Sequence, residues 1–508
     1  MKKFIISLFS LVIFSIGLTA QDLNEVERAS NNEHEHFGWD MALDGDWLVI
    51  GSPHSETDGG ADAGRVLVYQ RNGDGWDETQ ELTDADGNAF QNFGFSIDIS
   101  GDVLVVGAIG TFQHGPFTGR AYVYELTEGM WQLATSLEAE DGAPGTYFGH
   151  SVATNGDRIV VGAMKADGTV AQSGAVYDFE RVNGAWAFAN KLTPDDGVMN
   201  DNFGFSVDIS EQNTVVVGAP NQADFLEQSG AAYIFEYDGT AYAQTARLKA
   251  FNRTERDFLG TAVSISGTDV VAGAFLADGF SNNTGSVYFF SGENGQWLEK
   301  QQIAYQGSGL NDYFGKTLDI SPLRLVIGAP KANSSTATDV GQSYYYVKDG
   351  DTWSLRQVLD DPEASDHNFF GASVAISDFD LAVSARMDDA HGNDGGTVYA
   401  AGLGQVTSTE DEIVLDRAIE LVNYPNPTQQ QVTISYKLFK ASRVALEVFD
   451  NSGQPIKQLL PEAIQQAGNQ QVEWNLTSWN GSRVTNGLYF YKLSIDGAVI
   501  TRKIIVSR

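Results

Sequence analysis

The sequence predicts an all-β protein, a seven-bladed β-propeller followed by a small Ig-like β-sandwich. Three observations support this: a motif that recurs at constant spacing, four strand-like segments in each repeat, and a change of composition near residue 420. The motif is clearest at residues 93–108, FGFSIDISGDVLVVGA, and seven copies of it recur every 55 or 56 residues. A period this constant is typical of repeat architectures.

The seven copies share an aromatic residue or leucine, a glycine, an apolar run and an ending close to Gly-Ala. Their first glycines are Gly38, Gly94, Gly149, Gly204, Gly260, Gly315 and Gly371. Glycine is abundant in the chain and proline is scarce, with 54 and 12 residues, which suits short strands joined by tight turns.

Each repeat contains four segments with different patterns. In the copy at 93–108 the first segment alternates apolar and polar residues, which indicates a strand with one buried face. The second, VLVVGA, is continuously apolar, which is typical of a strand buried on both faces. A third segment opens at Gly119 with GRAYVY, and a fourth carries Trp131. Stacking such sheets around an axis covers both faces of each, and closing the ring leaves no end sheet exposed.

The two ends of the repeat region are complementary. After Gly396 the last repeat lacks a fourth segment, while residues 23–29, LNEVERA, precede the first copy where a fourth segment would stand. We therefore expect the N-terminal strand to complete the seventh blade. The predicted domains are a signal peptide at 1–20, the propeller at 21–403, an acidic linker at 404–419 and a C-terminal domain at 420–508.

The N-terminus and the composition limit the classes of function. Two lysines precede an apolar run that ends near Leu18, as in a secretory signal peptide. This run is shorter than the ~20 residues of a membrane span, so we expect no transmembrane span in the mature chain. There is no cysteine, which excludes disulfides and thiolate chemistry. The formal net charge of −36 argues against nucleic-acid binding, because acidic surfaces repel phosphate backbones.

The repeats resemble FG-GAP repeats, the unit of integrin-α-like propellers. The FG, GA and G-x-x-Y-x-F elements recur at fixed offsets over about residues 22–402. The resemblance implies the propeller fold, but the family includes adhesion receptors, enzyme-associated propellers and many proteins of unknown role. Integrin-type propellers bind calcium through DxDxDG-like loops between the first two strands. Here those connections are short turns, such as SGD at Ser100, so the resemblance does not carry a calcium site over.

The C-terminal 89 residues resemble another family. NYPNP at 423–427, LEVFDNSGQPI, GLYFYKL and the closing KIIV are similar to the type A sorting domain of type IX secretion cargo. The resemblance implies export by the signal peptide, outer-membrane passage by the type IX secretion machinery through residues 420–508, and a location at the cell surface or outside the cell. An ordinary accessory β-sandwich is the alternative.

Two motifs of the repeat region could carry chemistry. GHSVA at 149–153 has the spacing of a nucleophile elbow with Ser151, but Ser151 stands in register with Ser96 of the preceding repeat and no helix follows. HEH at 34–36 would place two imidazoles on one side of a strand, but no third ligand lies nearby, so we favour a solvated loop. We expect no catalytic residue and no cofactor-binding residue.

Ring closure would bring together the acidic loops of the first and seventh blades. The candidate metal ligands at this seam are Asp58, Asp62, Asp388, Asp389 and Asp394, with His54, Glu56 and His391 on the same face. Calcium is the ion left open for this seam, and a solvated acidic rim is the alternative.

The sequence favours a non-enzymatic exported protein that mediates adhesion or binds an extracellular protein or glycan. An extracellular polysaccharide- or protein-degrading enzyme is the second class, and it would need acids or histidines that converge on one face. A structural spacer propeller is the third. Because the acids and serines within the motif drift from copy to copy, we interpret the motif as scaffold and expect function in the variable loops.

Overall fold

The computed structural model describes most of the chain. The described residues are 23–28, 34–73, 75–84, 89–110, 115–223, 225–278, 283–293, 295–305, 311–334, 337–390, 393–403, 421–438, 442–450, 454–466, 468–479, 481–495 and 498–507. The predicted signal peptide at 1–20 and the predicted linker at 404–419 lie outside them. Among the described residues all regular structure is β-strand. That part of the chain therefore offers no apolar helix of membrane-spanning length.

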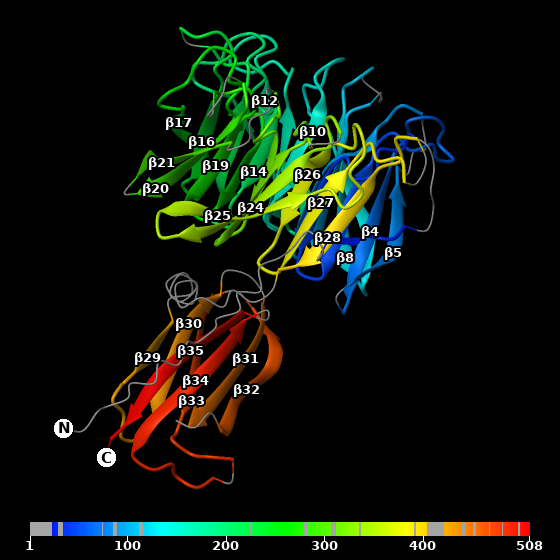
Figure 1. Cartoon of the computed structure of the whole chain (residues 1–508). Coiled ribbons are helices and arrows are strands. Elements are labelled where there is room, and N and C mark those ends of the chain that lie inside the picture. The colour runs from blue at the N-terminus through cyan, green and yellow to red at the C-terminus, as the bar shows by residue number, and fades with distance from the viewer. Residues whose placement is uncertain are drawn as a thin grey trace, which may run out of the picture.

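Residues 23–403 form seven sheets of four antiparallel strands, numbered here in chain order (Figure 1). Sheet 1 consists of β2 (Met41–Asp44), β3 (Trp47–Ser52), β4 (Arg65–Asn72) and β5 (Gly75–Thr83), and sheet 2 of β6 (Phe93–Ser100), β7 (Val103–Ala108), β8 (Arg120–Thr127) and β9 (Met130–Leu137). Sheet 3 consists of β10 (Phe148–Thr154), β11 (Arg158–Ala163), β12 (Ala175–Val182) and β13 (Ala185–Leu192), and sheet 4 of β14 (Ser206–Ile209), β15 (Thr214–Ala219), β16 (Ala231–Tyr237) and β17 (Tyr242–Leu248).

The remaining sheets continue the same order. Sheet 5 consists of β18 (Val263–Ser266), β19 (Asp269–Ala274), β20 (Ser286–Glu293) and β21 (Gln296–Ala304), and sheet 6 of β22 (Thr317–Ile320), β23 (Arg324–Ala329), β24 (Gln342–Asp349) and β25 (Thr352–Asp360). Sheet 7 consists of β26 (Phe370–Ile376), β27 (Asp380–Ala385), β28 (Thr397–Gly402) and β1 (Asn24–Glu25). The first strand of each sheet contacts that of the next, and β26 contacts β2, so the sheets surround a common axis. This is the propeller architecture that the repeat pattern predicts.

The second strand of each sheet is buried on both faces, as its continuous apolar pattern predicts. In β7 every residue is buried. Val103 and Val105 pack in the core shared with sheet 3, and Leu104 and Val106 pack in the core shared with sheet 1. Alternate side chains of one strand therefore serve two different cores. Each sheet is thereby held between its neighbours, and packing rather than disulfide bonds stabilises the ring.

A backbone contact joins each sheet to the next. The glycine that opens the third strand forms a parallel bridge with the motif aromatic of the following sheet, as between Gly119 and Phe148. Phe148 N donates to Thr118 O at 3.0 Å, and the equivalent bond recurs from Phe93, Phe203, Leu259, Phe314 and Phe370. At Gly119 φ is +79°, and an added Cβ would lie 1.8 Å from Phe148 O. Only glycine allows so close an approach.

The N-terminal strand lies at the edge of sheet 7. Asn24 pairs with Ala400 and Glu25 with Tyr399, antiparallel to β28. Behind this short strand Glu35 is buried and accepts hydrogen bonds from Arg65 at 2.7 Å and from Arg28 at 3.4 Å. The closing sheet is therefore held by two backbone pairs and a buried ion cluster that links the N-terminal segment to sheet 1.

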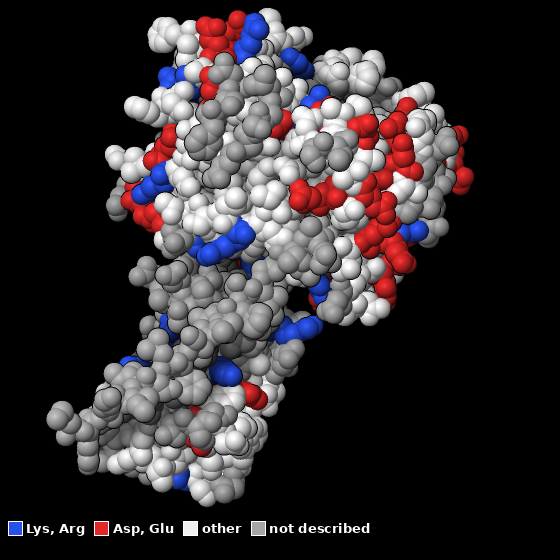
Figure 2. Space-filling view, viewed as in Figure 1, with Lys and Arg blue, Asp and Glu red and all other residues white. Residues whose placement is uncertain are grey.

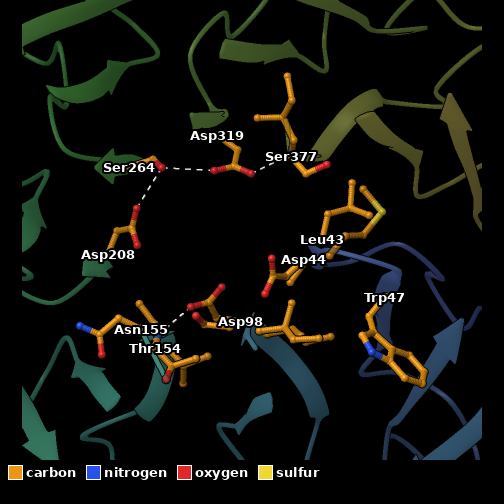
Figure 3. Close-up of a pocket in the computed structure, with 18 of the residues that line it drawn as sticks. Leu43, Asp44, Trp47, Asp98, Thr154, Asn155, Asp208, Ser264, Asp319 and Ser377 are labelled. Atoms are coloured by element: carbon orange, nitrogen blue, oxygen red, sulfur yellow. Dashed lines mark hydrogen bonds between the residues drawn. The ribbon is translucent and has the colours of Figure 1, made fainter. Parts of the chain in front are cut away.

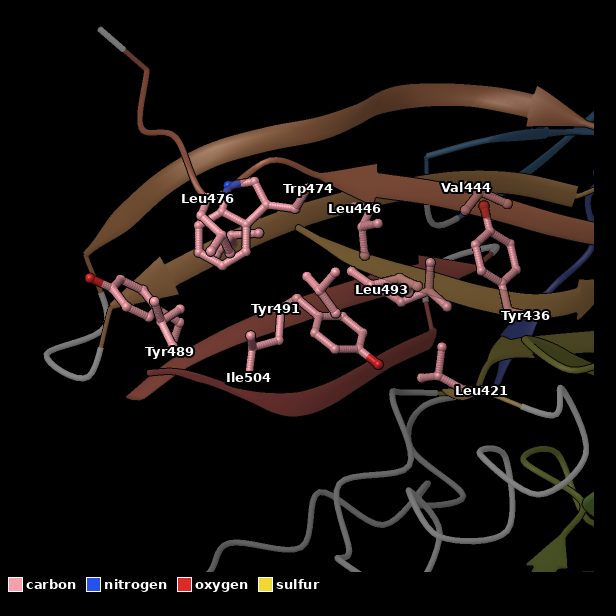
Figure 4. Packing of buried hydrophobic residues seen from close by; sticks show 14 of the residues in the cluster. Leu421, Tyr436, Val444, Leu446, Trp474, Leu476, Tyr489, Tyr491, Leu493 and Ile504 are labelled. Atoms are coloured by element: carbon pink, nitrogen blue, oxygen red, sulfur yellow. The ribbon is translucent and has the colours of Figure 1, made fainter. Parts of the chain in front are cut away.

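The C-terminal residues form a separate β-sandwich. One sheet contains β29 (Val422–Tyr424), β30 (Val432–Leu438) and β33 (Gly468–Trp474), and the other contains β32 (Pro455–Gln465), β31 (Ser442–Asp450), β34 (Gly487–Ile495) and β35 (Ala498–Val506). Their inner faces meet in a core that includes the fully buried Trp474, Tyr436 and Tyr491 (Figure 4). This core involves no propeller residue among those described, so the tail has the packing of an independent domain.

The inter-sheet glycine contact yields a matched test. We expect Gly119→Ala to lower the free energy of unfolding by at least about 3 kcal/mol, because it combines backbone strain with a backbone clash. Gly129→Ala is the control: Gly129 has a similar φ of +81°, but nothing lies within 4 Å of an added Cβ. Strain alone should cost about 1 kcal/mol there. Denaturant unfolding of both variants measures the difference, and equal losses would contradict the assigned role of the contact.

Candidate ligand-binding channel

A cavity of about 1670 Å³ runs along the axis of the propeller, lined mainly by the first strands of the seven sheets and also by Ser442, Arg443, Ile464 and Ser494 of the C-terminal sandwich. Figure 3 shows side chains of several sheets pointing into it. We call this cavity the channel. Its FG face is the end at which the first strands begin and where the loops between second and third strands lie, and its hairpin face is the opposite end. Concave sites of this kind are the usual location of ligands.

Three aspartates line the channel at one repeat position, five residues after the motif aromatic, in sheets 2, 4 and 6. Each accepts a hydrogen bond from a backbone N–H of the next sheet's first strand. The pairs are Thr154 N to Asp98 at 2.6 Å, Ile265 N to Asp208 at 2.7 Å and Ile376 N to Asp319 at 2.8 Å (Figure 3). The first strands are sheet edges, whose outward N–H groups have no partner in their own sheet. The carboxylates supply that partner and link the sheets in pairs.

Two further residues complete this belt of oxygen atoms. Ser264 occupies the same repeat position in sheet 5, and its Oγ lies 2.9 Å from Asp208 and 3.2 Å from Asp319. A hydroxyl has only one proton to donate, so it serves both carboxyl groups fully only when one of them is protonated. In sheet 1, Asp40 accepts a hydrogen bond from Ile97 N at 2.8 Å.

The surrounding protein raises the pKa of all four carboxyl groups. Burial raises the pKa of Asp40 and Asp319 to about 7 and that of Asp208 to about 6, although backbone hydrogen bonds oppose the shift. The pKa of Asp98 lies well above its ordinary value because of burial first and repulsion by Asp208 second. Near neutral pH the channel therefore carries a mixture of protonated and ionised carboxyl groups.

The serines of the motif have a structural role. At three residues after the motif aromatic, four hydroxyls donate to the carbonyl of the next sheet's first glycine, whereas Ser373 in sheet 7 donates to Asp40 at 3.5 Å. The pairs are Ser96 to Gly149 at 2.9 Å, Ser151 to Gly204 at 3.0 Å, Ser206 to Gly260 at 2.9 Å and Thr317 to Gly371 at 2.8 Å. Ser151 thus makes the same contact as its repeat equivalents, which agrees with its interpretation as scaffold.

Four ring side chains form an arc at the FG face of the channel. Each stands two residues after the motif aromatic of its own sheet. Trp39, Phe95, His150 and Phe205 come from sheets 1 to 4 in succession. Neighbouring ring centroids are 5.4 Å apart between Trp39 and Phe95, 5.4 Å between Phe95 and His150, and 4.8 Å between His150 and Phe205. Burial lowers the pKa of His150 to about 4, so its ring is neutral at physiological pH. Lys316 occupies the equivalent position in sheet 6.

The structure does not gather the predicted seam residues into a metal site. Asp62 lies 3.1 Å from His54, Asp394 lies 3.3 Å from His34, and Asp389 accepts a hydrogen bond from Asp394 N at 2.8 Å. The buried Asp388 accepts from Ala390 N at 2.7 Å, while Asp58 and Glu56 are exposed. His391 lies outside the described residues. Within the described ranges, no three His, Asp or Glu side chains are placed to hold a metal ion.

The HEH segment differs from the solvated loop that we expect from sequence. His34 is 60% exposed, but Glu35 is buried in the ion cluster with Arg28 and Arg65. The ring of His36 packs 5.0 Å from that of His54 and 6.0 Å from that of Trp39. The segment therefore belongs to the ring closure and to the edge of the aromatic arc.

Sequence reasoning missed the channel lining. The variation of acids among the motif copies was interpreted as drift, yet Asp98, Asp208 and Asp319 alternate regularly with smaller residues. The aromatic residues two positions after the motif aromatic carry a similar signal in the first four copies. The two positions are three residues apart, so alternation alone would place them on opposite faces of a strand. Pairing of the first strand is irregular near them, between Phe93 and Ser96 and between Phe148 and Ser151, and the sequence does not show this irregularity.

The raised pKa of Asp40 predicts a pH dependence of stability. With a pKa of about 7 in the folded chain against 3.8 ordinarily, the folded state binds more protons between these values, so stability falls as pH rises through this window. From pH 5 to pH 8 we expect the wild type to lose on the order of 1 to 2 kcal/mol relative to Asp40→Asn, allowing for screening in the open channel. Unfolding midpoints over this pH range measure the difference.

Asp44→Asn is the control, because Asp44 also accepts a bond from the next sheet, Gly101 N at 2.7 Å, but at the exposed hairpin face. An offset of Asp40→Asn from the wild type that stays constant with pH would contradict the assignment.

Comparisons with known proteins place both parts of the chain. The FG-GAP repeat model matches residues 29–69, 76–124, 131–179, 186–235, 242–290 and 353–401. The model of the secretion system C-terminal sorting domain matches residues 422–507. Integrin alpha-2 of Mus musculus is 26% identical over an alignment of 201 residues, and the match covers 35% of this chain and 16% of that protein. The chain thus spans a small part of the length of this relative.

Two solved structures have a related outline. PorZ, described as an essential bacterial surface component of the type-IX secretion system of Porphyromonas gingivalis, has a TM-score of 0.41 and 12% identity, covering 95% of this chain and 61% of that one. The β-propeller domain of the Trilobed protease from Pyrococcus furiosus, with an open velcro topology, has a TM-score of 0.38 and 8% identity, covering 68% and 90%.

The family matches fall on the elements described above. The FG-GAP matches together cover more than half of the chain. Five of the six span the fourth strand of one sheet and the first three of the next, and β22 to β24 of sheet 6 lie outside them. The sorting-domain match coincides with the C-terminal sandwich. Both resemblances drawn from the sequence are confirmed, and the sorting domain indicates export to the cell surface or secretion. The chain belongs to the FG-GAP repeat family, as a β-propeller with a C-terminal secretion sorting domain.

Proposed function

We propose that this protein is an exported, non-enzymatic propeller that binds an extracellular ligand at the FG face of its channel, and that it acts in adhesion or ligand capture. The observation that carries the proposal is the arc of Trp39, Phe95, His150 and Phe205 around the mouth of a large cavity. Aromatic side chains dominate binding-site energetics because they bury large areas with few rotatable bonds. These rings are half-buried, so part of each remains available to a ligand.

The proposal moves the site from the loops to the channel. The sequence leads us to expect function in the variable loops, and the long loops between second and third strands do surround the FG face. A ligand that enters the channel would pass these loops first. The motif is then scaffold at its glycine and apolar positions and contributes to binding at the position two residues after the motif aromatic.

An array experiment tests this proposal with the full chain. Glycan and protein arrays, each with and without calcium, should reveal a ligand, and we expect Phe95→Ala to weaken its binding at least about tenfold. Leu133→Ala is the matched control, because Leu133 lies on the outermost strand of the same sheet and is 43% exposed. Equal binding by the Phe95→Ala variant would place the site elsewhere, and the absence of any ligand would favour the structural spacer.

Delivery by the tail makes a separate prediction. Since residues 421–507 have a core of their own, residues 420–508 fused to a signal peptide and a reporter should carry the reporter across the outer membrane of a host with type IX secretion. Cell fractionation locates the reporter. Retention in the periplasm would contradict the role of the tail, and a fusion that carries Trp474→Ala should be retained because it opens the core.

A further inference from the structure

Two basic side chains, those of Lys316 and Arg386, lie beside aromatic rings at the FG face of the propeller. Lys316 lies in sheet 6, two residues after Phe314, and its Nζ is 4.8 Å from the ring of Phe275 and 5.7 Å from that of Phe205. Arg386 directly follows β27, and its guanidinium carbon is 4.8 Å from the ring of Trp39. Both therefore lie beside the aromatic arc, and Lys316 lines the channel.

Neither cation is paired with an acid in the described part of the chain. Arg386 Nε is buried without a hydrogen-bond partner there. No acidic side chain among those described offsets the lowered pKa of Lys316 or Arg386. Many other basic residues of the propeller are paired with carboxylates, as are Arg28, Arg65, Arg71, Arg120, Arg158, Arg181, Lys191, Arg247, Arg256, Lys300 and Lys348. Lys331 resembles Lys316 in that it contacts aromatic rings, those of Tyr313 and Phe369.

This placement is unusual for so acidic a chain. The sequence holds 67 acidic residues against 31 basic ones, so a carboxylate partner is available at most surface positions. A buried charge without a partner costs free energy. Burial first and the charge of Arg386 second lower the pKa of Lys316 to about 8, so the ammonium group remains mostly charged at pH 7. A ligand with a negative group would remove this cost by supplying the missing partner.

The neighbouring acids do not fill that role. The channel carboxylates Asp98, Asp208 and Asp319 stand three residues further along their strands than the arc, a distance of about 10 Å. They are committed to backbone N–H groups of the next sheet. At the level of the arc the channel therefore combines two cations with apolar rings, and these three carboxylates lie deeper. Asp40 directly follows Trp39 and is committed to Ile97 N, while Glu56 and Asp58 are exposed on a loop of the FG face.

The size and the walls of the site indicate the kind of anion. The channel, at about 1670 Å³, exceeds the roughly 300–1,000 Å³ of common small-molecule pockets, so it has room for several linked units. Aromatic rings bind ligands that present a flat apolar face. A sugar ring has such a face on its C–H side, and uronic or sulfated sugars add an anionic group to each unit. An acidic peptide supplies the charges without a repeated flat face.

We propose that the FG face of the channel binds an acidic oligosaccharide, with Lys316 and Arg386 contacting its carboxylate or sulfate groups and the aromatic arc contacting its sugar rings. This inference rests on the proposed ligand-binding function and names the ligand class. Arg386 is the residue for a bidentate contact, because its guanidinium presents a planar fork of donors, and Lys316 acts as a point charge.

The test uses the full chain and titration calorimetry with three acidic probes: oligogalacturonate, oligoalginate and heparin oligosaccharide. The methyl esters of the two uronates are their uncharged counterparts, and desulfated heparin, which keeps its carboxylates, is the counterpart of reduced charge. Polyglutamate is the peptide probe. We expect at least one acidic sugar to bind, its counterpart to bind at least about tenfold more weakly, and Lys316→Met and Arg386→Met each to weaken binding at least about tenfold. Arg256→Met removes an exposed charge paired with Glu227 and should change affinity less than about twofold.

Stability supplies a second measurement. Because Lys316 is a half-buried cation without an acidic partner among the described residues, Lys316→Met should keep or raise the unfolding midpoint while it weakens binding. A lower midpoint would mean that Lys316 has a structural role, and would overturn the assignment of Lys316 as a ligand contact.

Each other outcome is also decisive. Equal binding by the two Met variants, or equal binding of charged and uncharged sugars, would overturn the inference. Binding of polyglutamate without any sugar would replace the sugar with an acidic peptide. If the arrays yield only a neutral ligand, the inference fails and the proposed function stands, whereas the absence of any ligand overturns both.

Discussion

The propeller depends on one backbone hydrogen bond, repeated at each boundary between sheets. The donor is the N–H of the motif aromatic. The acceptor is a carbonyl of the preceding sheet, that of the residue just before the glycine at the start of the third strand, as in the bond from Phe148 N to Thr118 O at 3.0 Å. The last boundary uses the same bond, from Phe37 to Gly395 at 3.0 Å. The FG element and the G-x-x-Y element are thus two halves of a single contact. A side chain at the glycine would separate the backbones and remove the bond.

Closure of the ring is the boundary that this repeated contact cannot secure alone. The chain must bring its N-terminal segment to β28, more than 370 residues away in sequence, and the strand that does so contains only two residues. The buried ion cluster of Glu35 with Arg28 and Arg65 adds directional contacts at this point. Buried ion pairs contribute more to a unique arrangement than to net stability, which suits a boundary that must select one partner strand.

Sequence reasoning succeeded where a physical requirement repeats in every copy. The close approach at Gly119 and the two-sided burial of Val103 to Val106 recur seven times, so constant spacing reveals them. It failed where one copy differs for a reason that lies in its neighbour. Asp98 accepts a hydrogen bond from Thr154 N, which has no partner in its own sheet, and Lys316 contacts the rings of Phe205 and Phe275, which belong to two other sheets. The aspartate bonds span 56 or 57 residues, about one repeat, so they can be recognised only when neighbouring copies are compared and the order of the sheets is known.

The acidic exterior does not by itself prevent an anionic ligand from reaching the channel. Figure 2 shows Asp and Glu side chains gathered over the side of the propeller near β4 and β5, where Asp77 and Glu81 are exposed. These acids lie on the outermost strand, three strand spacings or about 14 Å from the first strand. The Debye length at physiological ionic strength is about 8 Å, so their field is largely screened at the channel. In the proposed site, the charges nearest to the ligand would be those of Lys316 and Arg386, which lie beside the aromatic arc.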